Sequence, residues 1–203
     1  MSIATAEGDL VTGRYRLVDF LGEGGVSKAW LGRDERTGEE VVVKHPNYDS
    51  ENTAAVVRDS IEREMEVLES IEEAGGHPNL MGLVDRVKVD GHPAMVVEHV
   101  TGETLYDAVR RRNGFTNAED VRQVGVDLCR AMSFLHEHEI IYRDLKPDNV
   151  MLHSTLRPVL IDFNTAKGFV PGESGGSGTV IPNPTYKPPE LNNDPDLVGY
   201  RQG

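Results

Sequence analysis

Apolar and polar positions in the first hundred residues predict a small antiparallel sheet with one helix. Short apolar runs that end at glycine or at other turn residues are typical of strands, and Asp90-Gly91 between two such runs is a hairpin signal. Over residues 54–74 the apolar positions instead recur at steps of three and four, which predicts a helix, and Gly75-Gly76 ends it. The five predicted strands are residues 15–21, 28–33, 41–43, 82–89 and 92–98.

Helical patterns dominate after Gly102. Thr116 followed by Glu119 has the form of a capping box, and it predicts a helix that runs to about Glu137. Beyond Ile140 the chain has short strand-like pieces between polar loops, and residues 171–189 are rich in glycine, proline and serine. The pattern therefore predicts an α+β protein with a sheet-rich first lobe, a mostly helical second lobe and a join near residues 98–102.

The N-terminal residues 1–13 are small and polar, and they predict a flexible tail with neither a basic leader nor a hydrophobic stretch. The chain has 203 residues, enough for one domain or a tight two-lobed one. No apolar run approaches the length of a membrane span, so we expect a cytoplasmic protein without a membrane partner. The single cysteine, Cys129, excludes an intrachain disulfide, and its apolar neighbours predict a buried thiol.

Charge narrows the range of partners. The chain carries 34 Asp and Glu against 21 Lys and Arg, a formal net charge of −13. Nonspecific binding to nucleic acids or anionic membranes needs a positive surface. We therefore expect no nucleic-acid partner.

A glycine cluster at Gly22-Glu23-Gly24-Gly25 lies between two predicted strands. Glycines let the backbone approach a phosphate, and the amides exposed in such a turn can bind it. A structural turn explains the cluster equally well when it is taken alone. A P-loop needs a serine or threonine at position 29 and a following helix, and here Ala29 and a strand follow.

Two charged residues gain meaning as a pair. Lys44 ends the apolar run Val41-Val42-Val43, and Glu64 lies on the predicted helix. Taken singly, a lysine at a strand end usually reaches solvent, and a glutamate usually belongs to a charged helix face. Together they supply what a phosphate-binding lysine needs, a carboxylate that fixes its direction.

The most specific stretch is Tyr142-Arg143-Asp144-Leu145-Lys146-Pro147-Asp148-Asn149, followed by Ile161-Asp162-Phe163-Asn164. A carboxylate for a hydroxyl, a lysine two residues on, and an asparagine with a distant aspartate for Mg²⁺ are the parts that phosphoryl transfer requires.

With these motifs the chain resembles the eukaryotic-type (Hanks-type) serine/threonine protein kinases, from about Tyr15 to Glu190. The resemblance implies the two-lobed α+β kinase fold, with a five-stranded antiparallel sheet and one helix at residues 14–98. Residues 99–203 would form an incomplete, mostly helical second lobe. The lysine at position 146 resembles the serine/threonine branch, and Glu190 would close the activation segment.

The same resemblance implies the site residues and cofactors. Lys44, paired with Glu64, would bind ATP phosphates, and Asp144 would orient the hydroxyl of a protein substrate while Lys146 steadies the phosphate. Asn149 and Asp162 would bind Mg²⁺. The implied ATP-binding residues are Gly22, Glu23, Gly24, Ser27, Ala29, Val42, Lys44, Val97, Glu98, Val100 and Met151.

Some positions depart from the family pattern. Ser27 replaces the third glycine of the turn, Ala29 and Val42 exchange the usual valine and alanine, and Asn164 replaces the glycine of Asp-Phe-Gly. Asn183 stands where the family has threonine. These departures affect loop geometry more than chemistry.

Two other functions stay open. A pseudokinase that acts as a nucleotide-binding scaffold would usually lack Lys44, Asp144 or Asp162, and all three are present. A kinase for small molecules on the same fold is the second alternative, and the long segment from Asp162 to Glu190 speaks weakly against it.

Regulation and support are further expectations. A phosphate on Ser174, Ser177 or Thr179 could dock on Arg143 and Lys167 and order the activation segment. The residues after Glu190 are mostly polar and cannot form the buried helix that follows in the family. We therefore expect that a missing part of the second lobe, or another chain, supports the catalytic loop.

Overall fold

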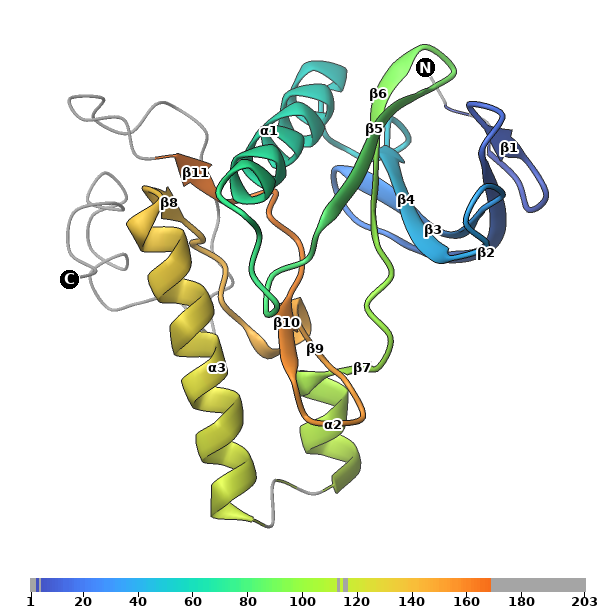
Figure 1. Cartoon of the computed structure of the whole chain (residues 1–203). Coiled ribbons are helices and arrows are strands. Elements are labelled where there is room, and N and C mark those ends of the chain that lie inside the picture. The colour runs from blue at the N-terminus through green and yellow to red at the C-terminus, as the bar shows by residue number, and fades with distance from the viewer. Residues whose placement is uncertain (1–2, 4, 113, 115–116, 169–203) are drawn as a thin grey trace. The chain divides into compact units, whose positions relative to one another are not determined.

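The computed structural model describes residues 3, 5–112, 114 and 117–168 (Figure 1). The chain divides into two compact units, Met1–Thr101 and Gly102–Gly203. The division follows Thr101, whereas the sequence placed the end of the first lobe at Glu98.

A curved antiparallel sheet forms most of the first unit. In the described part of this unit the sheet has six strands in the order β1-β2-β3-β4-β6-β5. All five predicted strands are present, and β1 is an addition to them. The strands are β1 (Leu10–Val11), β2 (Tyr15–Glu23), β3 (Ser27–Asp34), β4 (Glu40–Pro46), β5 (Leu83–Val89) and β6 (His92–Glu98).

Strand β1 corrects the prediction of a flexible tail at residues 1–13. Val11 pairs with Tyr15, and the Gly8 amide donates to the Leu17 carbonyl at 2.9 Å. The side chains of Ile3 and Val11 are buried in one cluster with those of Tyr15 and Leu17. The prediction was wrong for these residues because backbone pairing and two apolar side chains outweigh a polar average composition.

The side chains of strand β4 alternate between the two faces of the sheet. Successive side chains of a strand point to opposite faces, and Val41 and Val43 belong to the buried cluster that contains Tyr15. Val42 and Lys44 therefore point to the other face. Helix α1 (Ala54–Glu73) packs against β4, β5 and β6.

Helix α1 confirms the predicted helix at residues 54–74. The Thr53 side chain accepts a hydrogen bond from the Val56 amide and caps the N-terminus, which satisfies one of the free amides of the first turn. Its buried residues recur at helical spacing: Val57, Ile61, Glu64, Met65, Val67, Leu68 and Ile71. The strands β5 and β6 meet at the predicted turn, where Asp90 and Gly91 have φ values of 51° and 80°.

A polar cluster ties three strands together on the first unit. Arg14 donates from Nε to both carboxylate oxygens of Asp34 at 3.0 Å, and its Nη1 donates to Asp85 at 3.3 Å. The hydroxyl of the buried Tyr15 also donates to Asp85, at 2.8 Å. Burial and the Asp85 carboxylate raise the pKa of Tyr15. The cluster joins the start of β2 to the end of β3 and to β5.

The described part of the second unit combines two helices with short strands. Its sheets are three-stranded, in the order β10-β9-β7, and two-stranded, β11-β8. The elements are β7 (Glu103–Thr104), α2 (Leu105–Arg112), α3 (Ala118–Glu137), β8 (Ile140–Ile141), a 3₁₀ helix (Pro147–Asn149), β9 (Val150–Leu152), β10 (Pro158–Leu160) and β11 (Lys167–Gly168).

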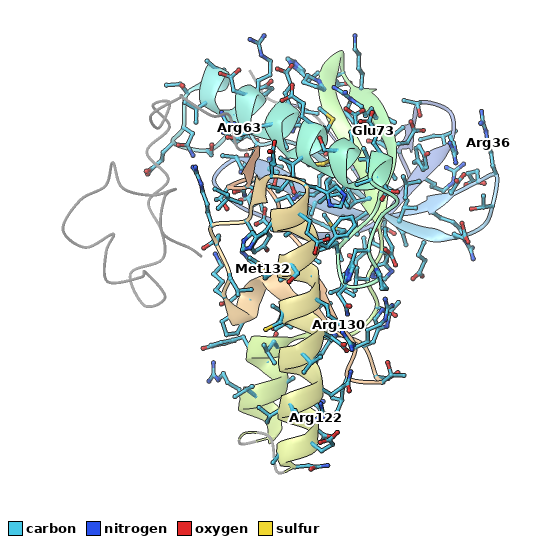
Figure 2. All side chains as sticks on the ribbon, turned by 60° about the vertical axis from the view of Figure 1, so that its left-hand side comes forward. Arg36, Arg63, Glu73, Arg122, Arg130 and Met132 are labelled. Atoms are coloured by element: carbon cyan, nitrogen blue, oxygen red, sulfur yellow. The ribbon has the colours of Figure 1, made fainter. Side chains whose placement is uncertain are left out.

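Helix α3 confirms the predicted helix to Glu137 but not its cap. Its N-cap is Asn117, whose side chain accepts from the Glu119 amide at 2.9 Å, and the predicted cap Thr116 lies outside the described residues. Figure 2 shows Arg122 and Arg130 on this helix, and both residues are exposed.

Cys129 corrects a second prediction, because it is exposed rather than buried. The buried positions of α3 are Val124, Ala131 and Leu135. These residues share one helix face, and a residue five positions after Val124 points well away from it. Among the helices that the structure describes, none is both long enough and apolar enough to cross a membrane.

Candidate active site

Cross-strand register brings four of the predicted nucleotide-binding residues onto one face of the sheet: Ala29, Val42, Lys44 and Val97. Gly22 pairs with Ala29, Ala29 pairs with Lys44, and Val42 pairs with Val97. Side chains directly opposite each other in an antiparallel pair project to the same face, and Val42 shares that face with Lys44 because they are two residues apart. The sheet thus places small and apolar positions beside a cation.

Lys44 and Glu64 form the predicted ion pair. The distance from Lys44 Nζ to Glu64 Oε1 is 2.6 Å, and the two side chains are 11% and 1% exposed. Strand β4 and helix α1 supply one partner each, so the pair forms only when the helix packs on the sheet. The Glu64 carboxylate therefore fixes the direction of the Lys44 ammonium group.

The glycine turn between β2 and β3 has partners that the sequence did not reveal. The turn is closed by the Gly24 amide, which donates to the Ser27 carbonyl at 2.8 Å. Asn47 donates from Nδ2 to the Gly24 carbonyl at 2.8 Å, and Asn52 donates to the Gly25 carbonyl at 2.7 Å. Asparagine readily bonds to nearby backbone, but its distant partners could not be predicted.

The end of β6 and the residues after it include two predicted ATP-binding residues, Glu98 and Val100. The Glu98 amide donates to the Gly82 carbonyl at 2.9 Å, so this amide is already used within the first unit. His99 Nδ1 lies 3.0 Å from Glu40 Oε2, and Val100 is buried. The Glu98 amide is therefore not available to a ligand.

In the second unit Asp144 is held by two side chains. Lys146 Nζ lies 2.6 Å from Asp144 Oδ2, and Asn149 Nδ2 donates to Asp144 Oδ2 and to its carbonyl, both at 3.0 Å. The side chains of Asp144 and Lys146 are 17% and 22% exposed. A carboxylate with fixed direction and access to solvent can orient a hydroxyl group and accept its proton.

Asn149 and Asp162 were predicted as Mg²⁺ ligands. The Ile161 amide donates to the Asn149 carbonyl at 2.9 Å, which brings the segment of Asp162 beside the loop. Mg²⁺ prefers oxygen ligands and often takes one or two from the protein and others from phosphates. Asn149 Nδ2 is engaged by Asp144, so a cation would be bound through the amide oxygen of Asn149 and not through its nitrogen.

Within the described ranges no group of three or more His, Cys, Asp or Glu side chains could hold a metal ion. A cation at Asn149 and Asp162 therefore needs further oxygens from its ligand. Asp162 has a φ of 65°, and Arg143 beside Asp144 has a φ of 66°. Such values are uncommon outside glycine, and strained residues tend to cluster at functional sites.

Buried aromatic residues connect the loop that carries Asp144 to the segment that carries Asp162. The hydroxyl of Tyr142 donates to the Ile161 carbonyl, and its ring packs edge-on against Phe163 with centroids 5.2 Å apart. Thr165 donates from its hydroxyl to the Tyr142 carbonyl at 3.2 Å. The predicted nucleotide residue Met151 lies half-buried on β9, opposite Val159 of β10.

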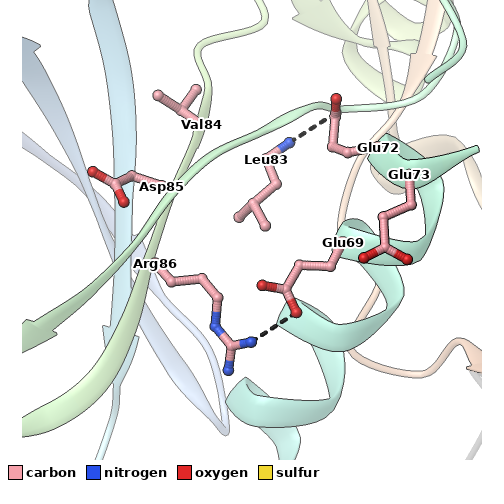
Figure 3. Close-up of a pocket in the computed structure, with 7 residues that line it drawn as sticks. All are labelled: Glu69, Glu72, Glu73, Leu83, Val84, Asp85 and Arg86. Carbon is pink, nitrogen blue, oxygen red and sulfur yellow. Dashed lines mark hydrogen bonds and ion pairs between the residues drawn. The ribbon is translucent and has the colours of Figure 1, made fainter. Parts of the chain in front are cut away.

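A separate hollow of about 470 Å³ lies between α1 and β5 (Figure 3). Arg86 pairs with Glu69 at 2.7 Å across it, and the Leu83 amide donates to Glu72 at 3.2 Å. None of the predicted site residues lines it. These contacts attach the C-terminal half of α1, the helix that carries Glu64, to β5.

The predicted activation segment is not part of this description. Ser174, Ser177, Thr179, Asn183 and Glu190 lie outside the described residues. Their assignments stay predictions.

Comparison with known proteins identifies similar sequences over most of the chain. Residues 15–198 match the family described as the protein kinase domain. The chain is 30% identical over 156 residues to the cell division control protein 2 homolog 3 of Trypanosoma brucei brucei, covering 77% of this chain and 48% of that protein. It is 27% identical over 186 residues to the probable serine/threonine-protein kinase PknB of Lactococcus lactis, covering 90% of this chain and 28% of that protein.

A third similar protein is the CBL-interacting protein kinase 22 of Oryza sativa, at 30% identity over 207 residues. That match covers 93% of this chain and 46% of the rice protein. The chain therefore spans less than half the length of these curated relatives.

Proposed function

Because the chain belongs to the protein kinase domain family, we propose that it transfers the γ-phosphoryl group of ATP to serine or threonine hydroxyls of protein substrates. The observation that carries the proposal is the Asp144 carboxylate held by Lys146 and Asn149. Relatives from Lactococcus lactis and Myxococcus xanthus that carry the words serine/threonine-protein kinase in their names support the choice of acceptor.

In this proposal Asp144 orients the attacking hydroxyl and accepts its proton as the new oxygen–phosphorus bond forms. Lys146, 2.6 Å from that carboxylate, offsets charge on the phosphoryl group in transfer. Lys44 binds the α- and β-phosphates, in the direction set by Glu64. Mg²⁺ held by Asn149 and Asp162 would neutralise charge on the phosphate oxygens.

The remaining assignments surround the nucleotide. Gly22, Glu23, Gly24 and Ser27 would cover the phosphates, and their turn joins β2 to β3 next to Ala29. Val42, Val97, Glu98 and Val100 would bind the adenine from the first unit, and Met151 is the corresponding assignment in the second unit. A cytoplasmic location is the corresponding proposal, because the reaction consumes ATP. Support of the catalytic loop by a further segment or another chain remains part of the proposal.

The test offers the chain Mg²⁺ and ATP with a generic protein acceptor and, separately, with a panel of hydroxyl-bearing metabolites. We expect phosphoserine or phosphothreonine on the protein by mass spectrometry. Transfer to a metabolite alone would indicate a small-molecule kinase, and ATP binding without any transfer would indicate a pseudokinase. Asp162→Ala should abolish the Mg²⁺-dependent part of ATP binding, and unchanged affinity would contradict the metal assignment.

A further inference from the structure

The connector between β4 and α1 binds three successive carbonyls of the glycine turn. Asn47 Nδ2 donates to the Gly24 carbonyl at 2.8 Å, and Asn52 Nδ2 donates to the Gly25 carbonyl at 2.7 Å. The backbone amide of Asn47 donates to the Val26 carbonyl at 3.0 Å. The carbonyls of residues 24–26 therefore all point toward the connector.

The direction of these carbonyls fixes the direction of the amides. In a trans peptide the C=O and the following N–H point to opposite sides, and the described residues contain no cis peptide. The amides of Gly25, Val26 and Ser27 thus point away from the connector, side by side. Successive amides with a common direction form a binding site for anions. Among the described residues, the amides of Gly25 and Val26 donate to no protein acceptor.

The connector itself is held in place by contacts among its own residues and by contacts with residues before and after the glycine turn. Asn47 is buried, with 4% of its surface exposed, and its Oδ1 accepts from the Asp49 amide at 3.2 Å. Asp49 in turn lies 2.6 Å from Nζ of Lys28, the residue after the turn, and Glu23 before the turn lies 3.7 Å from the same nitrogen. The Asp49 carboxylate raises the pKa of Lys28, so this ion pair persists at neutral pH.

Restraint of this turn before a ligand arrives lowers the entropic cost of binding the ligand. Glycine loses more conformational freedom than any other residue when it is ordered, and a ligand that must order a glycine turn binds more weakly by that cost. We propose that Asn47 and Asn52 are positioning residues that hold the turn in its phosphate-binding form before nucleotide arrives. The inference rests on the proposed function, since it takes the anion to be the phosphates of ATP.

The experiment compares Asn47→Ala, Asn52→Ala and the double variant with the unaltered chain. Asn79→Ala is the matched control, because Asn79 is a buried asparagine of the same unit that lies outside the turn and the connector. Two ligands are titrated by calorimetry, Mg²⁺-ATP and adenosine, which lacks phosphates. Amide hydrogen exchange over residues 22–27 is measured without ligand.

We expect the double variant to bind Mg²⁺-ATP about tenfold more weakly, since preorganisation acts mainly on affinity, with smaller losses for the single variants. Adenosine affinity should stay unchanged, and exchange over the turn should become faster. The control should change neither the selectivity between the two ligands nor the exchange of the turn. Asn52→Ala keeps the test informative if Asn47→Ala fails to fold, since Asn52 is exposed.

Three results would overturn the inference. Equal losses for ATP and adenosine would show a general structural role, and unchanged or tighter ATP binding would show that the contacts do not prepare the turn. If the unaltered chain binds adenosine and ATP equally, with no contribution from phosphates, the proposed function fails together with the inference. The second result, with ATP bound tightly by both the unaltered chain and the variants, would remove the inference and leave the proposed function.

Discussion

Two lysine–carboxylate pairs of equal length have different surroundings in the two units. Lys44 and Glu64 lie 2.6 Å apart with side chains 11% and 1% exposed, and Lys146 and Asp144 also lie 2.6 Å apart but are 22% and 17% exposed. The first pair joins a strand to a helix, and the second closes within one loop. Distance alone therefore says little about what a charged pair does.

The difference lies in what each pair costs and supports. Burying Glu64 removes most of its hydration, and only a well-placed partner repays that loss. Asp144 keeps contact with water and has a second donor in Asn149. After the loss of Lys146 its carboxylate would still be hydrated and would still accept a hydrogen bond from Asn149. We infer that the first pair carries stability as well as ligand binding, whereas the second carries mainly chemistry.

The largest expected effect tests the exposed pair. Asp144→Asn keeps the shape of the side chain but removes the charge that accepts a proton. Turnover should fall by roughly 10²- to 10⁴-fold, the usual contribution of a general base, while ATP affinity and the unfolding midpoint stay near those of the unaltered chain. Steady-state assays, ATP titration and urea denaturation measure the three quantities.

Asp148→Asn is the matched control, since Asp148 is an exposed aspartate four residues along the same loop. It should leave turnover nearly unchanged. If Asp144→Asn retained full turnover, or unfolded the chain, the division between chemistry and stability would be wrong.

The next effect tests the buried pair. Glu64→Ala removes the carboxylate that lies 2.6 Å from the buried Lys44 ammonium, so the free energy of unfolding of the first unit should fall by about 3 kcal/mol. Urea denaturation followed by the fluorescence of Trp30, the single tryptophan of the chain, reports on this unit.

The double variant Lys44→Met/Glu64→Leu sharpens this result. Replacing both charges by apolar groups of similar size is often neutral for stability, so the double variant should recover most of the loss but bind no ATP. A double variant as unstable as Glu64→Ala would mean that packing, and not the broken ion pair, explains the loss.

The contact between the candidate site residues Lys44 and Glu64 could be predicted from the sequence, whereas their roles stay proposals. Lys44 and Glu64 meet as expected, and Asp144, Lys146 and Asn149 do so within one loop. The strands of the sheet followed from short apolar runs, since burial on one face or both leaves that pattern in the sequence. The turn at Asp90-Gly91 followed from local chemistry alone.

What could not be predicted depends on contacts between distant residues. Backbone pairing of β1 with β2 leaves no mark on composition, and the polar residues 1–13 therefore resembled a tail. Cys129 has apolar neighbours in sequence, but the buried face of α3 passes through Val124 and Ala131. Asn47 and Asn52 lie in a polar connector, where only the folded backbone shows that both reach the glycine turn.

The smallest effect concerns Asp34, a third paired carboxylate, which belongs to the first unit and is not among the predicted site residues. Arg14 contacts it at 2.6 Å from Nη2, and the Arg36 amide donates to it at 2.9 Å. The hydrogen bond from Arg14 lowers the pKa of Asp34 from 3.8 to about 2. If buried ion pairs stabilise the fold, protonation of Asp34 should break this pair and lower the stability of the first unit in acid.

The sign follows from proton linkage. Since the folded chain holds the Asp34 pKa below its unfolded value, the unfolded chain binds more protons between pH 4 and pH 2. The stabilisation is therefore fully present above about pH 4 and is lost as the pH falls toward 2.

The urea midpoint reported by Trp30 should drop across this window, and Asp34→Asn should be less stable near neutral pH with a shallower drop. Asp19→Asn, which changes an exposed aspartate of β2, should keep the full slope. Equal slopes for the Asp34 and Asp19 variants would show that the Arg14 pair does not contribute to acid sensitivity. In that case burial beside a cation would not be what distinguishes the stabilising carboxylates of the first unit from the reactive carboxylate of the second unit.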